Sequence, residues 1–541
     1  MMKIPPVVKA PSSRRNFCAF VALLAFALPG QAQTRAKTSK PAAKPSAQPA
    51  TSEGRAARAL EAARSNPLEL HEFLRRMPKG TDLHNHLTGA VYAESWIRAG
   101  AEDNLCVDPA TLSFFKTQAM TRSIPPQPVC GEGHAPAAQA FDDQHLYDSL
   151  IDAFSMRSFV PSAGVSGHDH FFDAFAKFRA VEKRHTGDWL DEVSARAAAQ
   201  NEQYLELMDT PDFSHTAAIA KEVGWNDDLA AFRQALLEIG LREDIAVARA
   251  HWDEASARRD RRQHCGKADA APGCRVEIRF IYQILRGFPK EQVFAQTLLG
   301  FEVAAADPRV VGINMVMPED AYIPMTDYAE QMRIVRFHHG LYPQVHITLH
   351  AGELAPGLVT RVGLCCHVRL AVEEAHAERI GHGVDVMYEN DPYALLKVMA
   401  EKRVMVEINL TSNDVILGIS GRNHPLPIYR KFGVPVALST DDEGVSRIDL
   451  THEYVRAVES YALRYEDLKQ MVRTGIEHSF LPGESLWTDP DAFHKLAGAC
   501  SGETFESEKL GPSCQEFLQK SEKAQQQAEL ERRFKVFEAT F

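Results

Sequence analysis

The sequence has no excess of positive charge. Its 541 residues include 60 Lys and Arg against 72 Asp and Glu, which gives a formal net charge of −12 at pH 7. Because nucleic-acid-binding surfaces are usually basic, this balance argues against nucleic acid as a partner. A neutral small molecule needs no electrostatic attraction, so the composition leaves that class of ligand open.

The N-terminus lacks an apolar run long enough to cross a membrane. Residues 9–15 are basic, residues 17–28 are apolar and residues 29–32 offer a small-residue cleavage site, whereas a spanning helix needs about 20 apolar residues. The pattern predicts a signal peptide over residues 1–32, with an uncleaved anchor as the alternative. The arginine pair in the basic segment resembles a twin-arginine signal, and the general secretory route is equally open. We expect export to the periplasm or the outside of the cell, without stable membrane insertion after signal removal.

The cysteines lack the spacing of a zinc cluster. There are nine of them, and Cys18 would leave with the signal. An even number would then remain in an exported chain, which favours disulfides, although the sequence does not fix their connectivity and buried free thiols are the alternative. Cys365 and Cys366 are adjacent and fall on a predicted helix. The other six form three pairs that are close in sequence: Cys106 with Cys130, Cys265 with Cys274, and Cys500 with Cys514.

The remaining chain divides into a linker, one large domain and a helical extension. Residues 33–55 are rich in Ala, Pro, Lys and Ser without apolar periodicity, which predicts a disordered linker. Residues 56–485 are predicted to form the domain, and residues 486–541 a C-terminal helical extension. A Pro-rich, Cys-containing stretch at about 100–167 reads as an irregular insertion that covers or rims the functional site, with surface elaboration as the alternative. Asn66 has the side chain and position of an N-cap residue for a short helix.

Eight strand-like runs alternate with helical patterns along the predicted domain. This alternation predicts a parallel (β/α)8 TIM-type barrel, an α/β fold with the insertion after its first strand. In such barrels the functional groups lie at the C-terminal ends of the strands. The predicted strands are 81–87, 204–208, 277–284, 309–315, 345–349, 379–382, 404–410 and 434–438.

Titratable side chains cluster at the ends of these predicted strands. His84 and His86 alternate in the first strand, so they share a face and lie about 7 Å apart along it. Two parallel imidazoles on one rigid strand can hold a divalent metal. A catalytic zinc site needs N and O ligands, an open position for water and a nearby base. Later strand ends supply these groups: His350, Glu353, His382, Asp441 and Asp442.

Five stretches, in this order, resemble the adenosine/AMP deaminase family of the metal-dependent amidohydrolases. They lie within residues 77–445, most of the chain that would remain after signal removal. The opening and the secretory start are also similar to extracellular deaminase growth factors and secreted bacterial deaminases. The stretches are PKGTDLHNHLTGA from Pro78, HAGE from His350, RIGHGVD from Arg379, NLTSN from Asn409 and LSTDDEGV from Leu438.

The resemblance implies zinc-dependent hydrolytic deamination of adenosine, and of deoxyadenosine, to inosine and ammonia, with a small purine nucleoside as the partner. It assigns catalytic roles to Glu353, which would move a proton onto N1 of the purine, and to His382, which with Asp441 would orient the attacking oxygen. Asp442 would contact N7. One Zn²⁺ per chain would have four ligands: His84, His86, His350 and Asp441.

Three positions differ from the common family pattern. Thr88 stands where many members have an Asp that contacts the ribose, and Met317 where a Gly usually offers its backbone N–H to the purine. Asn314 replaces a usual Asp, while Glu319 is a candidate substrate contact. These differences leave two alternatives open: a deaminase of another purine or aminated heterocycle, and a non-catalytic extracellular purine-binding or growth-factor-like protein.

Overall fold

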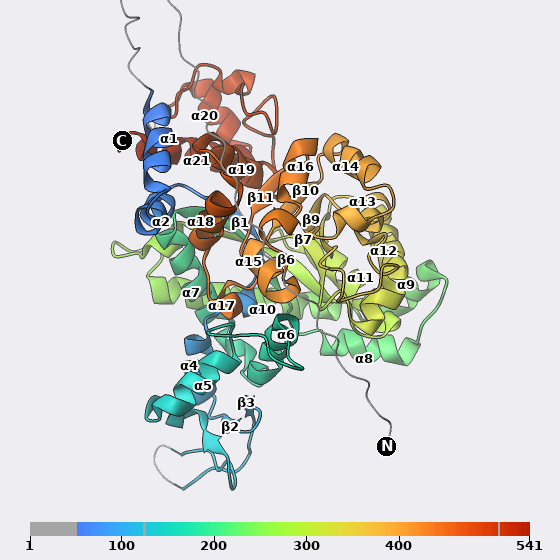
Figure 1. Cartoon of the computed structure of the whole chain (residues 1–541). Coiled ribbons are helices and arrows are strands. Elements are labelled where there is room, and N and C mark those ends of the chain that lie inside the picture. Colours follow the sequence, from blue (N-terminus) through green and yellow to red (C-terminus); the bar gives the residue numbers. More distant parts are fainter. Residues whose placement is uncertain (1–50, 123–125, 507–508) are drawn as a thin grey trace, which may run out of the picture. The chain divides into compact units, whose positions relative to one another are not determined.

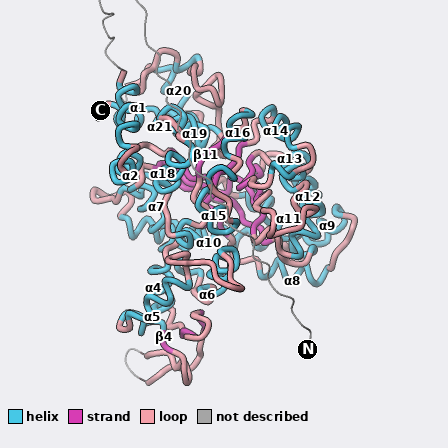
Figure 2. Tube along the Cα trace, in the orientation of Figure 1, coloured by secondary structure: helices cyan, strands magenta, loops and turns pink. Residues whose placement is uncertain are grey.

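Residues 51–122, 126–506 and 509–541 are described by the structure, a computed structural model. The predicted signal peptide and nearly all of the predicted linker lie outside the described residues. The predicted (β/α)8 barrel is confirmed: eight strands form one parallel sheet, with helices around it (Figures 1 and 2). In sheet order the strands are β1 (Gly80–His86), β5 (Glu202–Asp209), β6 (Glu277–Leu285), β7 (Val310–Val316), β8 (His346–Ala351), β9 (Arg379–His382), β10 (Met405–Ile408) and β11 (Val436–Leu438).

The ring of strands closes where the chain leaves β11. The backbone N–H of Asp441 donates to the carbonyl of His84 at 2.8 Å, and the N–H of His86 donates to the carbonyl of Asp441 at 3.3 Å. This isolated parallel bridge joins the first strand to the segment after the last one. Barrel closure therefore brings the first and last of the candidate metal-ligand motifs into direct contact.

Helices follow the strands and pack around them, as the predicted alternation requires. Between β7 and β8, for example, lies α12 (Tyr322–Leu341). The helices between β5 and the end of the barrel are α8 (Ser214–Val223), α9 (Leu229–Glu238), α10 (Glu243–Gln263), α11 (Lys290–Ala306), α12, α13 (His367–Glu373), α14 (Pro392–Glu401), α15 (Leu410–Leu417), α16 (Leu426–Phe432), α17 (Glu443–Ser446), α18 (Leu450–Tyr461) and α19 (Tyr465–Glu477).

The first two described helices pack against the last ones. α1 (Ser52–Ala63) and α2 (Pro67–Arg76) lie beside α21 (Glu522–Glu538), the red helix of Figure 1. The Phe73 ring of α2 contacts Tyr465, Phe537 and Phe541. The Asn66 side chain caps α2 as predicted, accepting from two backbone N–H groups. α20 (Pro512–Gln519) belongs to a small apolar cluster within residues 486–528.

The segment between β1 and β5 is more regular than predicted. It contains α3 (Leu87–Ala90), α4 (Ala93–Glu102), a three-stranded antiparallel sheet, α5 (Gln144–Ala153), α6 (Gly167–Phe178) and α7 (Thr186–Ala199). The sheet strands are β2 (Cys106–Asp108), β3 (Ser113–Phe115) and β4 (Ala135–Pro136). Pairing along β2 supplies regular backbone hydrogen bonds, so this part of the predicted irregular insertion is ordered.

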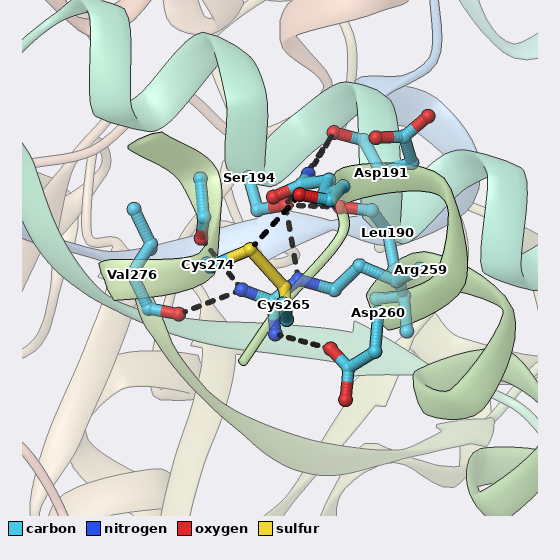
Figure 3. Close-up of a disulfide and its surroundings, with 10 residues drawn as sticks. Leu190, Asp191, Ser194, Arg259, Asp260, Cys265, Cys274 and Val276 are labelled. Carbon is cyan, nitrogen blue, oxygen red and sulfur yellow. Dashed lines mark hydrogen bonds and ion pairs between the residues drawn. A yellow bond between two sulfur atoms is a disulfide. The ribbon is translucent and has the colours of Figure 1, made fainter. Parts of the chain in front are cut away.

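Disulfides join the three cysteine pairs that the sequence favoured. Figure 3 shows the Cys265–Cys274 bond at the end of α10, beside the Arg259 side chain, which donates to the carbonyls of Gly273 and Val276. The prediction that Cys365 and Cys366 lie on a helix is wrong: they form a vicinal disulfide just before α13. In the described ranges no helix is both long and apolar enough to cross a membrane.

A fully buried ion-pair cluster lies inside the barrel. Arg379 of β9 pairs through Nη2 with Glu206 of β5 at 2.6 Å and through Nε with Glu407 of β10 at 2.7 Å, and all three side chains are 0% exposed. Tyr204 donates its hydroxyl to Glu206, and Thr348 donates to Glu407. Every charge in this cluster has an opposite charge in contact, and the cluster reaches the candidate site through the other oxygen of Glu407.

Candidate active site

Four predicted ligand atoms converge at the C-terminal ends of β1, β8 and β11. The Nε2 atom of His350 lies 3.1 Å from Nε2 of His84 and 3.2 Å from Nε2 of His86. The Oδ1 atom of Asp441 lies 3.4 Å and 3.2 Å from the same two nitrogens. His84, His350 and Asp441 are buried, and His86 is only slightly exposed. The period-2 alternation of β1 brings its two imidazoles to one face, as the sequence predicted.

In two of the imidazoles, the Nδ1 atom points away from the four converging atoms and makes a hydrogen bond that fixes the position of a proton. His84 directs Nδ1 at the Glu407 carboxylate, at 2.6 Å. Burial would raise the pKa of Glu407, but Arg379 and His84 lower it below its ordinary value, so it is an anion that only accepts. His350 directs Nδ1 at Oδ1 of Asn314, which also accepts from the backbone N–H of His350. Both Nδ1 atoms therefore carry a proton, and both Nε2 atoms point into the site, where a neutral ring offers a lone pair.

The Nδ1 atom of the third imidazole, His86, also faces a hydrogen-bond acceptor. The hydroxyl of Thr210 donates to the backbone carbonyl of Gln283, so its oxygen accepts from the Gln283 amide N–H at 3.1 Å. The amide oxygen then faces Nδ1 of His86 at 2.7 Å and takes its proton. Three Nε2 atoms thus face one another at hydrogen-bond distance, and each offers a lone pair to a metal ion when its ring is neutral.

This donor set fits a metal ion. Oδ1 of Asp441 is buried and has no hydrogen-bond partner among the described residues. Ligands held at about 2.0–2.1 Å by tetrahedral zinc lie about 3.3 Å from one another, which matches the separations of the four atoms. A cation resolves the repulsion between three lone pairs and a carboxylate. His84, His350, His382 and Asp441 form a buried group with metal-ligand spacing, and His86 joins Asp441 and Asp442 in a second.

Glu353 stands beside this cluster on the loop that follows β8. Its side chain is 7% exposed, and one of its oxygens lies 3.6 Å from Nδ1 of His382. Burial, together with the negative charges of Asp441 and Glu319, raises the pKa of Glu353 well above its ordinary value. A carboxyl group that keeps its proton near neutral pH can donate it to a ring nitrogen.

Glu319 holds the Glu353 loop in place. Its two oxygens accept the backbone N–H groups of Gly352 and Glu353 at 3.0 and 2.8 Å, and His367 contacts it at 2.5 Å. Burial would raise the pKa of Glu319, but His367 and Arg286 lower it to about 2. Glu319 is absent from the cavity lining. The structure therefore gives this predicted substrate contact the environment of a positioning residue.

A cavity of about 440 Å³ opens beside the four converging atoms. Thr88, Met317 and Asp442, which the sequence named as substrate contacts, all line it. Three phenylalanines of α6 form much of its apolar wall, whereas no described residue of the preceding insertion does. The other lining residues are His86, Phe171, Phe172, Phe175, Gln283, Leu285, Val316, Pro318, His350, Glu353, Ile416 and Asp441.

Two backbone features explain the positions of Met317 and Asp442. Met317 has a φ of +99°, a left-handed conformation that favours Gly, so the chain keeps that backbone shape while carrying a long side chain. The Met317 sulfur folds over Gly287 and accepts its N–H at 3.3 Å. A Cβ at Gly89 would come 1.5 Å from Oδ1 of Asp442, so this glycine makes room for the carboxylate.

Sequence reasoning assigned no role to several side chains that complete the site. Glu407 and Gln283 lie in no recognised motif, and Asn413 ends the NLTSN stretch without a predicted role; the partners of all three come from distant strands. Weak signals were present, since Glu407 is a carboxylate inside a buried strand.

The sequence profile of the family described as "Adenosine deaminase" matches residues 168–486, more than half of the chain. His84 and His86 lie outside the match. An adenosine deaminase of Escherichia coli (strain SMS-3-5 / SECEC) is 36% identical over 141 residues, which are 26% of this chain and 39% of that protein. The chain thus matches about two fifths of the length of this curated relative.

A solved structure shares the fold over most of both chains. The apo N6-methyl-AMP deaminase from Arabidopsis thaliana is 19% identical, with a TM-score of 0.50, and the match covers 76% of this chain and 94% of that one. At this identity the likeness concerns the barrel architecture.

Proposed function

This chain belongs to the adenosine deaminase family, and we propose from that premise that it deaminates adenosine, and also deoxyadenosine, to inosine and ammonia. The observation that carries the proposal is the convergence of three imidazole nitrogens and a buried carboxylate oxygen beside Glu353. A binding protein would have no need of a protonated, buried carboxyl group next to such a centre.

We propose zinc as the metal, one ion per chain. His84, His86, His350 and Asp441 would hold it, and their imidazole and carboxylate donors suit zinc. When bound, zinc supplies an activated water, because it lowers the pKa of water toward about 7. Glu353 holds a proton and passes it to N1 of the purine, which makes C6 electrophilic. Asp442 orients the ring through N7.

The cavity lining favours a nucleoside over a nucleotide. None of the described residues that line it is Lys or Arg, the side chains that usually recognise phosphate. Its wall beyond the acidic and imidazole groups is largely apolar and includes phenylalanines of α6, Leu285 and Val316. A neutral ribose or deoxyribose costs less to place there than a phosphate dianion.

A second candidate is a deaminase of another purine or aminated heterocycle. Met317 favours it, because its side chain occupies cavity wall where the resemblance leads us to expect Gly. Thr88 favours it as well, since a hydroxyl replaces the acid that would hold a ribose. A non-catalytic purine-binding protein is the third reading, and a turnover assay separates it from both enzymes.

The test is a deamination screen with purified protein. Adenosine, deoxyadenosine, adenine and AMP are offered separately, and released ammonia is measured. We expect turnover of both nucleosides, with AMP at least about tenfold slower because the phosphate would lose hydration without gaining a cationic partner. Faster turnover of adenine or AMP would replace adenosine as the substrate. Purine binding without ammonia from any compound would support the non-catalytic reading.

We also propose that the protein is exported. The twin-arginine-like start motivates this, and the disulfides among the described residues support it, because such bonds persist in oxidising compartments. N-terminal sequencing of the native protein should find a start near Gln33. A start at Met1 in a cytoplasmic fraction would contradict export.

A further inference from the structure

We propose that Asn413 and His424 are positioning residues that hold His382 as the neutral tautomer with its proton on Nε2. His382 then serves as a hydrogen-bond donor to the oxygen that attacks the substrate, and it cannot take a proton from that oxygen. The kinetic consequence rests on the proposed deaminase function, whereas the tautomer itself can be observed without it.

The chain of hydrogen bonds begins at a backbone group whose role is fixed. The N–H of Leu426, at the start of α16, donates to Nδ1 of His424 at 3.1 Å. A backbone N–H can only donate, so Nδ1 of His424 presents a lone pair. His424 is 2% exposed, and burial, helped by the charge of Arg456, lowers its pKa to about 4. The ring is therefore neutral near pH 7 and carries its single proton on Nε2.

This proton decides the orientation of the next side chain. Nε2 of His424 lies 3.0 Å from Oδ1 of Asn413, so the amide oxygen accepts. The amide nitrogen of Asn413 then points at Nδ1 of His382, at 2.8 Å, and donates to it. Asn413 is fully buried on α15, which leaves no water to replace either contact. Nδ1 of His382 must accept, and the proton of this ring lies on Nε2.

Two other groups face His382 and do not reverse this assignment. The amide nitrogen of Asn409 lies 3.5 Å from Nδ1, again on the donor side. One oxygen of Glu353 lies 3.6 Å from Nδ1, beyond a normal hydrogen bond. On the opposite side of the ring, Nε2 is buried, has no hydrogen-bond partner among the described residues, and lies 3.9 Å from Oδ2 of Asp441. The N–H therefore points toward the candidate metal centre.

The most informative variant is Asn413→Asp, which keeps the size of the side chain but reverses its hydrogen bonding. A carboxylate only accepts, so Nδ1 of His382 would carry a proton. Nε2 would then present a lone pair to the attacking oxygen, or the ring would be doubly protonated and charged. In the zinc-loaded enzyme we expect kcat for adenosine to fall roughly 10²- to 10⁴-fold, the range for a misplaced acid–base group. Zinc content and the Kd of inosine, the product, should stay unchanged. Asn423→Asp, the same exchange at an exposed position of the adjoining turn, is the matched control.

Two substitutions of His424 are expected to lower kcat to different extents. His424→Gln can keep the amide donor to Asn413, so we expect kcat within about threefold of wild type, whereas His424→Phe removes the donor and should cost roughly tenfold, the effect of one neutral hydrogen bond. A purely structural role would instead lower thermal stability in both variants without separating their kcat values.

Nuclear magnetic resonance on protein labelled with ¹⁵N-histidine provides the direct readout. His382, assigned by its loss in His382→Ala, should show a protonated Nε2 and a bare Nδ1 in wild type, and the reverse or a doubly protonated ring in Asn413→Asp. A protonated Nδ1 in wild type overturns the proposal, as does an Asn413→Asp enzyme within threefold of wild-type kcat. If wild type deaminates none of the four screened compounds, the proposed function fails and the tautomer measurement alone decides this inference.

Discussion

The barrel contains two neighbouring groups of buried charges that are arranged in opposite ways. In the cluster of Glu206, Arg379 and Glu407, every charge touches an opposite charge. In the group of His84, His86, His350 and Asp441, three imidazole nitrogens and a carboxylate face one another, and no Lys or Arg of the described residues pairs with that carboxylate. Burying unpaired charge is costly, so the second arrangement requires a ligand that the first does not. The comparison distinguishes buried charges that stabilise the fold from buried groups that serve the proposed reaction.

The two groups share one residue. Glu407 gives one oxygen to Arg379 and the other to Nδ1 of His84. The self-contained cluster therefore keeps Glu407 ionised and in place, and Glu407 in turn directs the lone pair of His84 toward the metal centre. The following four changes test this division, beginning with the largest expected effect.

Replacing His350 with Ala removes the nitrogen that touches both other imidazoles. We expect loss of bound metal and of all deaminase activity, because the remaining donors no longer enclose a cation. Circular dichroism should still show a folded barrel. Metal content by mass spectrometry and ammonia release from adenosine measure the two effects; a variant that keeps either one would contradict the assignment of His350 as a ligand.

Glu353→Gln changes only the ability to carry a proton. Turnover should fall roughly 10²- to 10⁴-fold, while zinc content and purine binding remain, since Gln preserves volume and most hydrogen bonds. Steady-state kinetics with adenosine, together with binding of the product inosine, separate catalysis from recognition. Turnover within about threefold of wild type would show that Glu353 does not transfer the proton.

Arg379→Ala breaks the self-contained cluster and leaves two buried carboxylates without their partner. The expected loss is about 3–5 kcal/mol in the free energy of unfolding, measured by denaturant titration. Arg75→Ala, which breaks the exposed pair with Glu72, is the control and should leave the free energy of unfolding nearly unchanged. Zinc affinity should fall by less than the roughly 10- to 100-fold typical of losing a direct partner of a ligand. A variant that keeps its stability but loses activity would show that the cluster of Glu206, Arg379 and Glu407 serves the reaction rather than the stability of the fold.

Thr348→Val is the mildest change to the same cluster. It removes the hydroxyl that donates to Glu407 at 2.9 Å and leaves Arg379 in place. We expect a loss of about 1.5–3 kcal/mol in unfolding free energy, as for a hydrogen bond to a charged group. Activity at saturating zinc should stay near wild type, and a collapse of activity would mean that Arg379 alone does not hold Glu407.

Local patterns in the sequence predicted much of this fold. All eight barrel strands were expected within about two residues of their observed ends, because alternating and buried apolar runs are local features. The Asn66 cap followed from an equally local signal, and the disulfides join three cysteine pairs that the sequence favoured without fixing their connectivity. The family resemblance assigned the four ligand candidates, which barrel closure at Asp441 brings together.

The partners that complete the site depend on register across distant strands. Glu407 reaches His84 from β10, and Gln283 reaches His86 from β6. Alternation predicts which face a side chain takes, but not which side chain stands opposite it. The chain from His424 through Asn413 to His382 likewise joins a turn, a helix and a strand. For Glu319 the resemblance indicated substrate contact, whereas its two backbone donors show why it supports the Glu353 loop.

The most direct test of the account is a metal titration of the purified wild-type protein. Zinc is removed with a chelator, added back in steps, and ammonia release from adenosine is measured at each step. The convergence of His84, His86, His350 and Asp441 predicts no activity in the metal-free protein and a rise that levels off at one zinc per chain. Full activity in protein shown to be metal-free would contradict the central claim that these buried, unpaired groups form a catalytic metal centre.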